Sequence, residues 1–326
     1  MFEIRETHLM AADGTPLAAY TCGSGEGPPL VLSHGLGGNI AAWRYLVDNF
    51  GGHHRIVSWD YRGLYRSGPA APPSDYTVPT HVADMGAVMD HVGVDRAVLV
   101  GWSMGCQVNL EMLRAAPQRV LGLVLINGTF GRAADRAPGP SLGDWLQLAP
   151  KILRGAESFA PTLRHLRHLL PDLARSQLLL EFLRGAGLVG DTADRRLFAE
   201  LAGEMAGLDP GVYLATLNAL GAHCAKASLP DVQVPTLVIA GDRDLFTPVA
   251  NSERVAKQID GAELMVIPSG THYTPLEFPE LVDLRIEKFV RERLGFNRSA
   301  ARGDAGERPG VTSRRRRKRR ASHQPD

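Results

Sequence analysis

The segment that most constrains the fold is the G-x-S-x-G motif Gly101-Trp102-Ser103-Met104-Gly105. The apolar run Ala97–Val100 precedes this motif and a helix-compatible stretch, Cys106–Ala116, follows it. The two glycines are expected because a strand and an outgoing helix that pack this closely leave no room for side chains in the turn. Ser103 is therefore predicted to lie on a sharp bend, beside the positive N-terminus of the helix.

Short apolar runs alternate with helix-length segments along most of the chain, which is typical of a parallel sheet with helices on both faces. The first two expected strands form an antiparallel opening, and about six later strands form a parallel run. The sequence therefore predicts an α/β fold built on a mostly parallel, eight-stranded sheet. The expected strands are Phe2–Leu9, Leu17–Cys22, Leu30–Ser33, Arg55–Trp59, Ala97–Val100, Gly122–Ile126, Thr236–Ala240 and Glu263–Ile267.

Residues 129–229 interrupt this rhythm. They contain no strand-like runs and show helical spacing, for example at Ser176–Leu183 and Gly211–Ala222. A segment of this length between the sixth and seventh strands indicates a helical insertion rather than a loop. We expect it to form a cap over the carboxyl ends of the strands, where open α/β sheets bind ligands. Residues 1–128 and 230–296 are then the predicted core.

The apolar pattern stops after residue 296, and residues 297–326 contain the basic run Arg314–Arg320. This tail has ten Lys or Arg against three Asp or Glu, a balance of +7, so the rest of a chain with net charge +1 carries −6. Such a block repels itself and cannot bury a core, so the tail is predicted to be disordered. Two interpretations of the tail remain open: it binds a polyanion weakly, or it is an extension without a partner.

Composition and cysteine usage favour a cytoplasmic protein. No apolar run of about 18 residues is present, so no membrane span is expected. The first residues, Met1–Glu6, lack the apolar core of a secretory signal. Cys22, Cys106 and Cys224 are odd in number and widely spaced, which argues against a disulfide framework or a metal cluster. Neither a metal nor an organic cofactor is implied, and the oligomeric state is not predicted.

Two later loops supply the groups that a nucleophilic serine needs. A serine hydroxyl requires a base, and the base requires an orienting carboxylate. His272 follows the eighth strand, and Asp242 and Asp244 follow the seventh, so both loops lie at the same sheet edge as Ser103. Asp242 directly follows the strand-end glycine and is better placed to brace its own loop. We therefore predict that Ser103, His272 and Asp244 converge as catalytic residues, with Asp242 as the alternative acid.

The tetrahedral intermediate of acyl transfer needs two N–H donors directed at its oxyanion. One predicted donor is the backbone N–H of Met104, the residue after the serine. The second is expected from the glycine-rich loop Ser33–Gly38, where we select the N–H of Leu36. This loop does not match the phosphate-binding patterns G-K-[ST] or G-x-G-x-x-G.

Together, the H-G-L-G-G loop, the G-W-S-M-G turn, the G-D-R-D-x-x-T-P segment and the late G-T-H resemble the α/β-hydrolase fold family. The resemblance is strongest to its serine esterase, enol-lactonase and non-haem haloperoxidase-like branch, and it spans about residues 2–294. Residues 59–68 resemble the family's D-x-R-G-x-G-x-S loop, but Tyr65 stands where the second glycine is usual. Dehalogenases and epoxide hydrolases of similar fold use aspartate at the turn, so Ser103 favours acyl transfer to water.

The motifs and the resemblance together predict a serine hydrolase that acts on a small-molecule acyl substrate. The expected reaction is cleavage of a carboxylic ester, lactone or thioester through an acyl-enzyme intermediate. Three alternatives remain open: an acyltransferase or haloperoxidase-like perhydrolase, a carbon–carbon bond hydrolase, and a non-enzymatic ligand-binding or interaction module.

Overall fold

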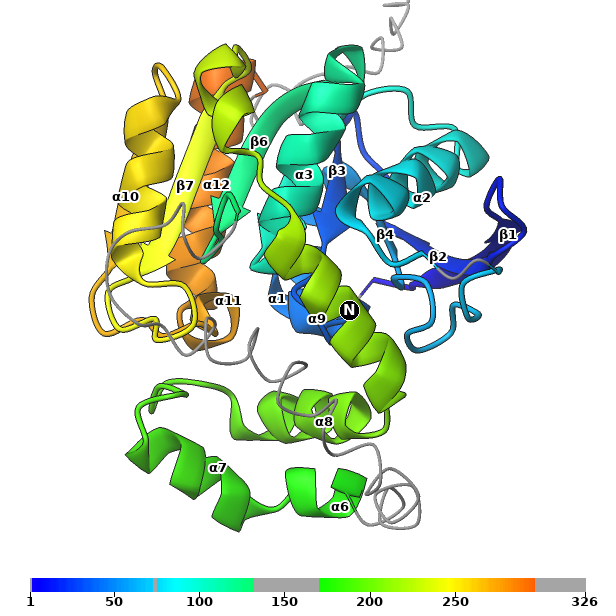
Figure 1. The fold of residues 1–326 in the computed structure, drawn as a ribbon. Helices are drawn as coiled ribbons and strands as arrows, with labels where there is room; N and C mark the ends of the chain where they lie inside the picture. Colours follow the sequence, from blue (N-terminus) through cyan, green and yellow to red (C-terminus); the bar gives the residue numbers. More distant parts are fainter. Residues whose placement is uncertain (1, 73–74, 132–169, 297–326) are drawn as a thin grey trace, which may run out of the picture. The chain divides into compact units, whose positions relative to one another are not determined.

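The computed structural model describes residues 2–72, 75–131 and 170–296, which belong to one compact unit (Figure 1). Part of the expected cap, residues 132–169, and the whole predicted tail, residues 297–326, lie outside the described residues. Among the helices that are described, none is long and apolar enough to cross a membrane.

A single eight-stranded sheet runs through the unit in the order β1-β2-β4-β3-β5-β6-β7-β8. Strand β2 pairs antiparallel with β1 and β4, and all other neighbours pair in parallel. This confirms the predicted mostly parallel sheet with its antiparallel opening. The strands are β1 Arg5–Met10, β2 Pro16–Cys22, β3 Gly27–Ser33, β4 His54–Trp59, β5 Ala97–Trp102, β6 Val120–Ile126, β7 Thr236–Gly241 and β8 Glu263–Ile267.

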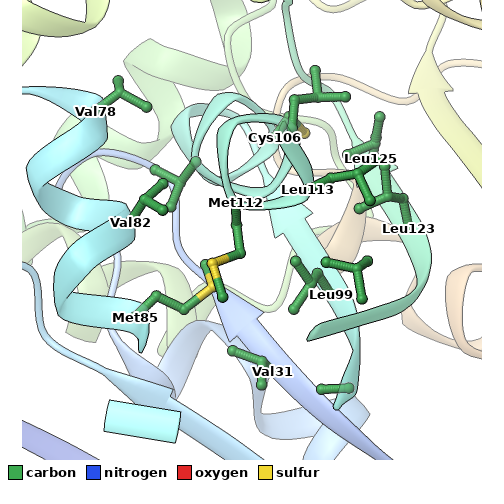
Figure 2. Packing of buried hydrophobic residues seen from close by; sticks show 14 of the residues in the cluster. Val31, Val78, Val82, Met85, Leu99, Cys106, Met112, Leu113, Leu123 and Leu125 are labelled. Carbon is green, nitrogen blue, oxygen red and sulfur yellow. The ribbon is translucent and has the colours of Figure 1, made fainter. Parts of the chain in front are cut away.

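Successive residues of the central strands point to opposite faces of the sheet, so each face has its own apolar core. Val31 and Leu99 belong to the core that packs against α2 Val78–His91, α3 Met104–Ala115 and α10 Val249–Gln258 (Figure 2). Their chain neighbours belong to the opposite core, against α1 Arg44–Phe50 and α12 Pro279–Leu294. Because buried parallel strands are apolar on both faces, their runs stand out in the sequence.

Helices occupy the described part of the insertion between β6 and β7. Helices α7 and α9 correspond to the expected helical segments, whereas α8 was not expected. Asp194 and Asp209 begin α8 and α9 by accepting hydrogen bonds from backbone N–H groups of the first turn. The elements are α6 Leu170–Ala174, α7 Gln177–Gly185, α8 Arg195–Ala206, α9 Pro210–Ala222 and the 3₁₀ segment η5 Lys226–Asp231. Three further short segments complete the core: η1 Ile40–Trp43, η2 Pro117–Arg119 and α11 Thr274–Glu277.

Candidate active site

The turn between β5 and α3 holds Ser103 in the left-handed region, with φ 56° and ψ −113°. Its backbone N–H donates to Ile126 O at 2.9 Å. A Cβ atom at Gly105 would lie 2.1 Å from Ser33 O, and one at Gly101 would lie 2.6 Å from Gly105 O. Both motif glycines are therefore required by close backbone approach, and a bend of this kind carries strain that the surrounding packing must hold.

Ser103, His272 and Asp244 form one hydrogen-bonded chain. The Ser103 Oγ lies 2.9 Å from His272 Nε2, and His272 Nδ1 lies 2.7 Å from Asp244 Oδ2. Each side chain comes from a different segment: the turn after β5, the loop after β7 and the loop after β8. His272 and Asp244 are both buried, so bulk water does not compete strongly for these hydrogen bonds.

The Asp244 carboxylate is fixed by its own loop. Oδ1 accepts from the backbone N–H groups of Phe246 and Thr247, each at 2.8 Å. The Thr247 hydroxyl lies 2.6 Å from Oδ2, the oxygen that faces His272. With these donors in place the carboxylate cannot turn away from the imidazole ring.

The alternative acid, Asp242, makes a different contact. It is exposed, and its Oδ1 accepts from the backbone N–H of Ser269 at 2.7 Å. Asp242 therefore braces the loop after β8 rather than its own loop, and Asp244 is the acid that contacts the imidazole.

The two predicted oxyanion donors, Leu36 and Met104, line the same cavity as Ser103. Met104 is the first residue of α3, so its N–H has no acceptor within the helix. The glycine-rich loop approaches the serine closely, because a Cβ atom at Gly35 would lie 3.3 Å from Ser103 Cβ. Both N–H donors therefore belong to backbone that lies beside the serine.

Tyr65, the departure from the family pattern, adopts φ 51°, a conformation that glycine tolerates better than tyrosine. Its hydroxyl donates a hydrogen bond to Gly37 O in the glycine-rich loop. The Tyr65 side chain therefore holds the glycine-rich loop through a hydrogen bond that a glycine at this position could not make.

Buried polar groups anchor the start of the same loop. His34 Nδ1 accepts from Trp43 Nε1 at 2.8 Å, and His34 Nε2 lies 2.8 Å from Ser58 Oγ. Complete burial lowers the pKa of His34 to about 3, so the ring is neutral in the folded protein. His34 is thus a structural support of the loop.

Asn127 is a site residue that the sequence analysis missed. It directly follows β6 with φ 45°, and its Nδ2 donates to the backbone oxygens of Thr271 and His272, each at 3.0 Å. Its Oδ1 accepts from the Gly241 N–H at 2.8 Å. One amide therefore ties the end of β6 to both loops. A polar residue at the end of a central strand was the signal that could have revealed it.

Glu277 was also missed. This buried carboxylate accepts from the Thr271 N–H at 2.8 Å and from the Thr271 hydroxyl at 2.5 Å. It also accepts from the backbone N–H of Gly190, between α7 and α8, at 2.7 Å. Glu277 thereby connects the loop that carries His272 to the insertion.

A cavity of about 400 Å³ lies beside the Ser103 hydroxyl, and most of its described lining is apolar. Helices α8 and α9 supply a large share of that lining, which the sequence analysis did not identify. The polar side chains in the described wall that do not belong to the Ser103–His272–Asp244 chain are Gln107, Thr129, Tyr213, Thr247 and Tyr273. The main lining residues from these helices are Phe198, Leu201, Ala202, Met205, Tyr213, Leu217 and Leu220.

Comparison with known proteins identifies the family. The profile described as alpha/beta hydrolase fold matches residues 28–279, most of the chain. The chain belongs to the α/β hydrolase fold family. A protein of Caulobacter segnis assigned as a carbamate hydrolase, RutD, is 30% identical over 265 residues, which cover 80% of this chain and 90% of the relative.

Two solved structures are similar to this α/β hydrolase over most of its length. The esterase RhEst1 from Rhodococcus sp. ECU1013 has a TM-score of 0.70 and 25% identity, covering 89% of this chain and 99% of that one. The enol-lactonase from Burkholderia xenovorans LB400 has a TM-score of 0.68 and 23% identity, covering 88% and 100%. The latter similarity shows the fold alone. Together these comparisons support an enzyme of the hydrolase class.

Proposed function

We propose that this α/β hydrolase is a serine hydrolase that cleaves a carboxylic ester, lactone or thioester through an acyl-enzyme intermediate. The observation that carries the proposal is the hydrogen-bonded chain from Ser103 Oγ through His272 to Asp244, at the wall of a largely apolar cavity. In the first step Ser103 Oγ attacks the substrate carbonyl carbon while its proton passes to His272 Nε2.

Asp244 accepts the Nδ1–H of His272, fixes the tautomer with a free Nε2 and stabilises the imidazolium that forms. The backbone N–H groups of Leu36 and Met104 donate to the oxyanion of the tetrahedral intermediate. Collapse of the intermediate breaks the bond to the leaving group, which takes the proton from His272. Water then attacks the acyl-enzyme with His272 as base, and the free acid leaves.

The cavity supports an acyl group of small to medium size with an apolar surface. Its volume of about 400 Å³ lies within the range of ordinary small-molecule sites. We further propose that residues 129–229 form a cap that shapes this space, because α8 and α9 contribute to its wall. The similarity to an assigned carbamate hydrolase adds carbamates to the substrates worth testing, since a carbamate presents the same attackable carbonyl.

The proposal is tested by a fluorophosphonate probe and a substrate panel of p-nitrophenyl esters, lactones, acyl thioesters and carbamates. We expect the probe to label the intact protein, and Ser103→Ala to lose labelling and about 10⁴- to 10⁶-fold in kcat. Ser24→Ala, at an exposed serine, is the matched control and should keep both. Retention of more than a few per cent of the activity in Ser103→Ala would refute the assignment.

Product analysis separates hydrolysis from acyl transfer. With water as acceptor the free acid is the product, whereas added alcohol or hydrogen peroxide would divert the acyl group in a transferase or perhydrolase. We expect the free acid to dominate in buffer that contains these acceptors at millimolar concentration.

A further inference from the structure

A second polar chain reaches the cavity wall one helical turn beyond the serine. Gln107 lies on α3 four residues after Ser103, is 1% exposed and lines the cavity. Its Oε1 atom lies 2.8 Å from His223 Nδ1, at the end of α9. Within the described residues, the Gln107 side chain makes this one hydrogen bond. The other end of the carboxamide is therefore available to a molecule in the cavity.

The chain continues away from the cavity along the same helix. His223 Nε2 lies 3.3 Å from Glu111 Oε2, and Arg114 Nη2 donates to Glu111 Oε1 at 2.6 Å. Residues 107, 111 and 114 are spaced so that they share one face of α3. Arg114 holds Glu111 as an anion and lowers the pKa of its carboxyl, and that anion holds His223.

The hydrogen-bonding capacity of these groups couples the protonation of His223 to the orientation of the Gln107 amide. An ionised Glu111 only accepts, and a neutral imidazole has one donor and one acceptor. Neutral His223 therefore donates from Nε2 to Glu111 and accepts at Nδ1, which requires the Gln107 amide to present its N–H to the ring, the reverse of the orientation in the structure, where Oε1 faces Nδ1. In that state the amide oxygen faces the cavity.

Protonation of His223 reverses this arrangement. Both ring nitrogens then donate, so the Gln107 oxygen turns to His223 Nδ1 and the amide NH₂ faces the cavity. In both states the Gln107 carboxamide hydrogen-bonds His223 Nδ1, through its NH₂ group when the ring is neutral and through its oxygen when the ring is protonated. A substrate group that only accepts hydrogen bonds can pair with the second state and not with the first.

We propose that Gln107 is a specificity-determining residue that hydrogen-bonds a polar group in the acyl part of the substrate, about one helical turn from the reacting carbonyl. His223 is the positioning residue that sets whether the Gln107 amide donates or accepts. This inference rests on the proposed role of Ser103, because that role fixes where the carbonyl lies. A buried amide left unpaired in an apolar wall is costly, so the site favours an acyl chain that satisfies it.

The charged groups that face His223 within the described residues, Glu111 and Arg114, both come from α3. Burial lowers the pKa of His223, Glu111 raises it, and the net effect places it below the ordinary value of 6.5. The donor-facing state is therefore expected to become populated as the pH falls below 6.5.

The test compares p-nitrophenyl 4-oxopentanoate with p-nitrophenyl pentanoate, which differ by a ketone oxygen that only accepts hydrogen bonds. The ratio of their kcat/KM values cancels the steps that both esters share. We expect the ratio for the intact protein to rise as the pH is lowered from 8 through the pKa of His223, by up to about tenfold, the effect of about one good hydrogen bond. In Gln107→Met and His223→Phe the ratio should not change with pH. His91→Phe, at an exposed histidine, should behave as the intact protein does.

A second readout does not depend on turnover. The Gln107 side-chain amide signal in a ¹H–¹⁵N spectrum, assigned by its loss in Gln107→Met, should shift with pH below 6.5 and stay fixed in His223→Phe. If Ser103 is not the nucleophile, Ser103→Ala keeps its labelling and turnover, or the intact protein shows neither, while this shift persists. If the ratio and the amide signal are both independent of pH in the intact protein, the inference about Gln107 and His223 is overturned.

Discussion

The Asp244 carboxylate accepts hydrogen bonds from its own loop through one oxygen and contacts the His272 imidazole through the other. A substitution that removes only its charge should therefore affect catalysis without unfolding the protein. In Asp244→Asn the amide oxygen can still accept from Phe246 and Thr247, but the NH₂ group would face His272 Nδ1 and select the wrong tautomer. We expect kcat to fall about 10⁴-fold with little change in melting temperature. Steady-state kinetics and thermal unfolding of the purified variant measure both.

The neighbouring aspartate provides the matched control. In Asp242→Asn the amide oxygen can replace the carboxylate as acceptor for the Ser269 N–H. We expect kcat within about threefold of the intact protein and a melting temperature within a few degrees. A catalytic loss confined to Asp242→Asn would exchange the roles of the two acids.

The residues that could be predicted from sequence are those whose motif fixes a backbone shape. The positions of Ser103 and Leu36 beside the cavity were predictable in this way, because tight turns and glycine-rich loops leave a local signature. Gln107 and His223 were not, because they lie 116 positions apart and meet only after the insertion has packed. No local pattern marks such a pair.

At the scale of the elements, the strands were predicted well because buried parallel strands form short apolar runs between polar loops. The observed strand ends differ from the predicted ones where packing rather than composition determines them. For example, β1 begins at Arg5 instead of the predicted Phe2. Helix α8 was missed although its apolar residues Leu197, Phe198, Leu201 and Met205 recur at helical spacing in the sequence. Its role in the cavity wall follows from packing that the sequence does not display.

The link between the insertion and the loop that carries His272 can be tested at Glu277. In Glu277→Gln one carboxylate oxygen becomes an NH₂ group, which cannot accept from both Thr271 and Gly190. We expect kcat to fall about tenfold, with a smaller change in KM, because the His272 loop loses an anchor. Amide hydrogen exchange at residues 190 and 271 should become faster.

Glu280→Gln, at an exposed position in the first turn of α12, is the control for that experiment and should change neither property. If exchange becomes faster in Glu277→Gln while kcat stays unchanged, Glu277 fastens the insertion without positioning His272. Unchanged exchange would exclude the anchoring role itself.

For the molecule as a whole, buried neutral histidines make folding sensitive to acid. Burial lowers the pKa of both His34 and His81 to about 3. Between pH 6.5 and pH 3 the unfolded chain binds these protons and the folded chain does not. Each histidine therefore subtracts up to about 1.4 kcal/mol of stability for every pH unit below 6.5.

We expect the free energy of unfolding to fall as the pH is lowered from 7.5 to 5.5, and to fall less in His81→Phe. Burial raises the pKa of Asp60 to about 6, which acts in the opposite direction, but this contribution is common to both proteins and cancels in their difference. Urea unfolding at several pH values gives the two slopes. Equal slopes would show that His81 does not bind its proton on unfolding as proposed.

The compact unit ends at Phe296, and its last contacts define where the chain can be cut. The Phe296 ring packs against His54 with ring centres 4.8 Å apart, and its N–H donates to Val290 O. Truncation after Phe296 should therefore preserve turnover and melting temperature. A chain that ends at Leu294 loses the aromatic contact, and we expect it to be less stable by about 1–3 kcal/mol.

The same truncation tests the basic tail. A run of seven consecutive Lys or Arg residues, Arg314–Arg320, predicts electrostatic attraction to a polyanion that weakens steeply with salt. Heparin retention at rising salt concentration should therefore be lost on truncation after residue 296, while turnover of the test substrate stays unchanged. Equal retention of both chains would favour an extension without a partner. Unfolding or loss of turnover in the truncated chain would contradict both versions, because it would make the tail part of the folded unit.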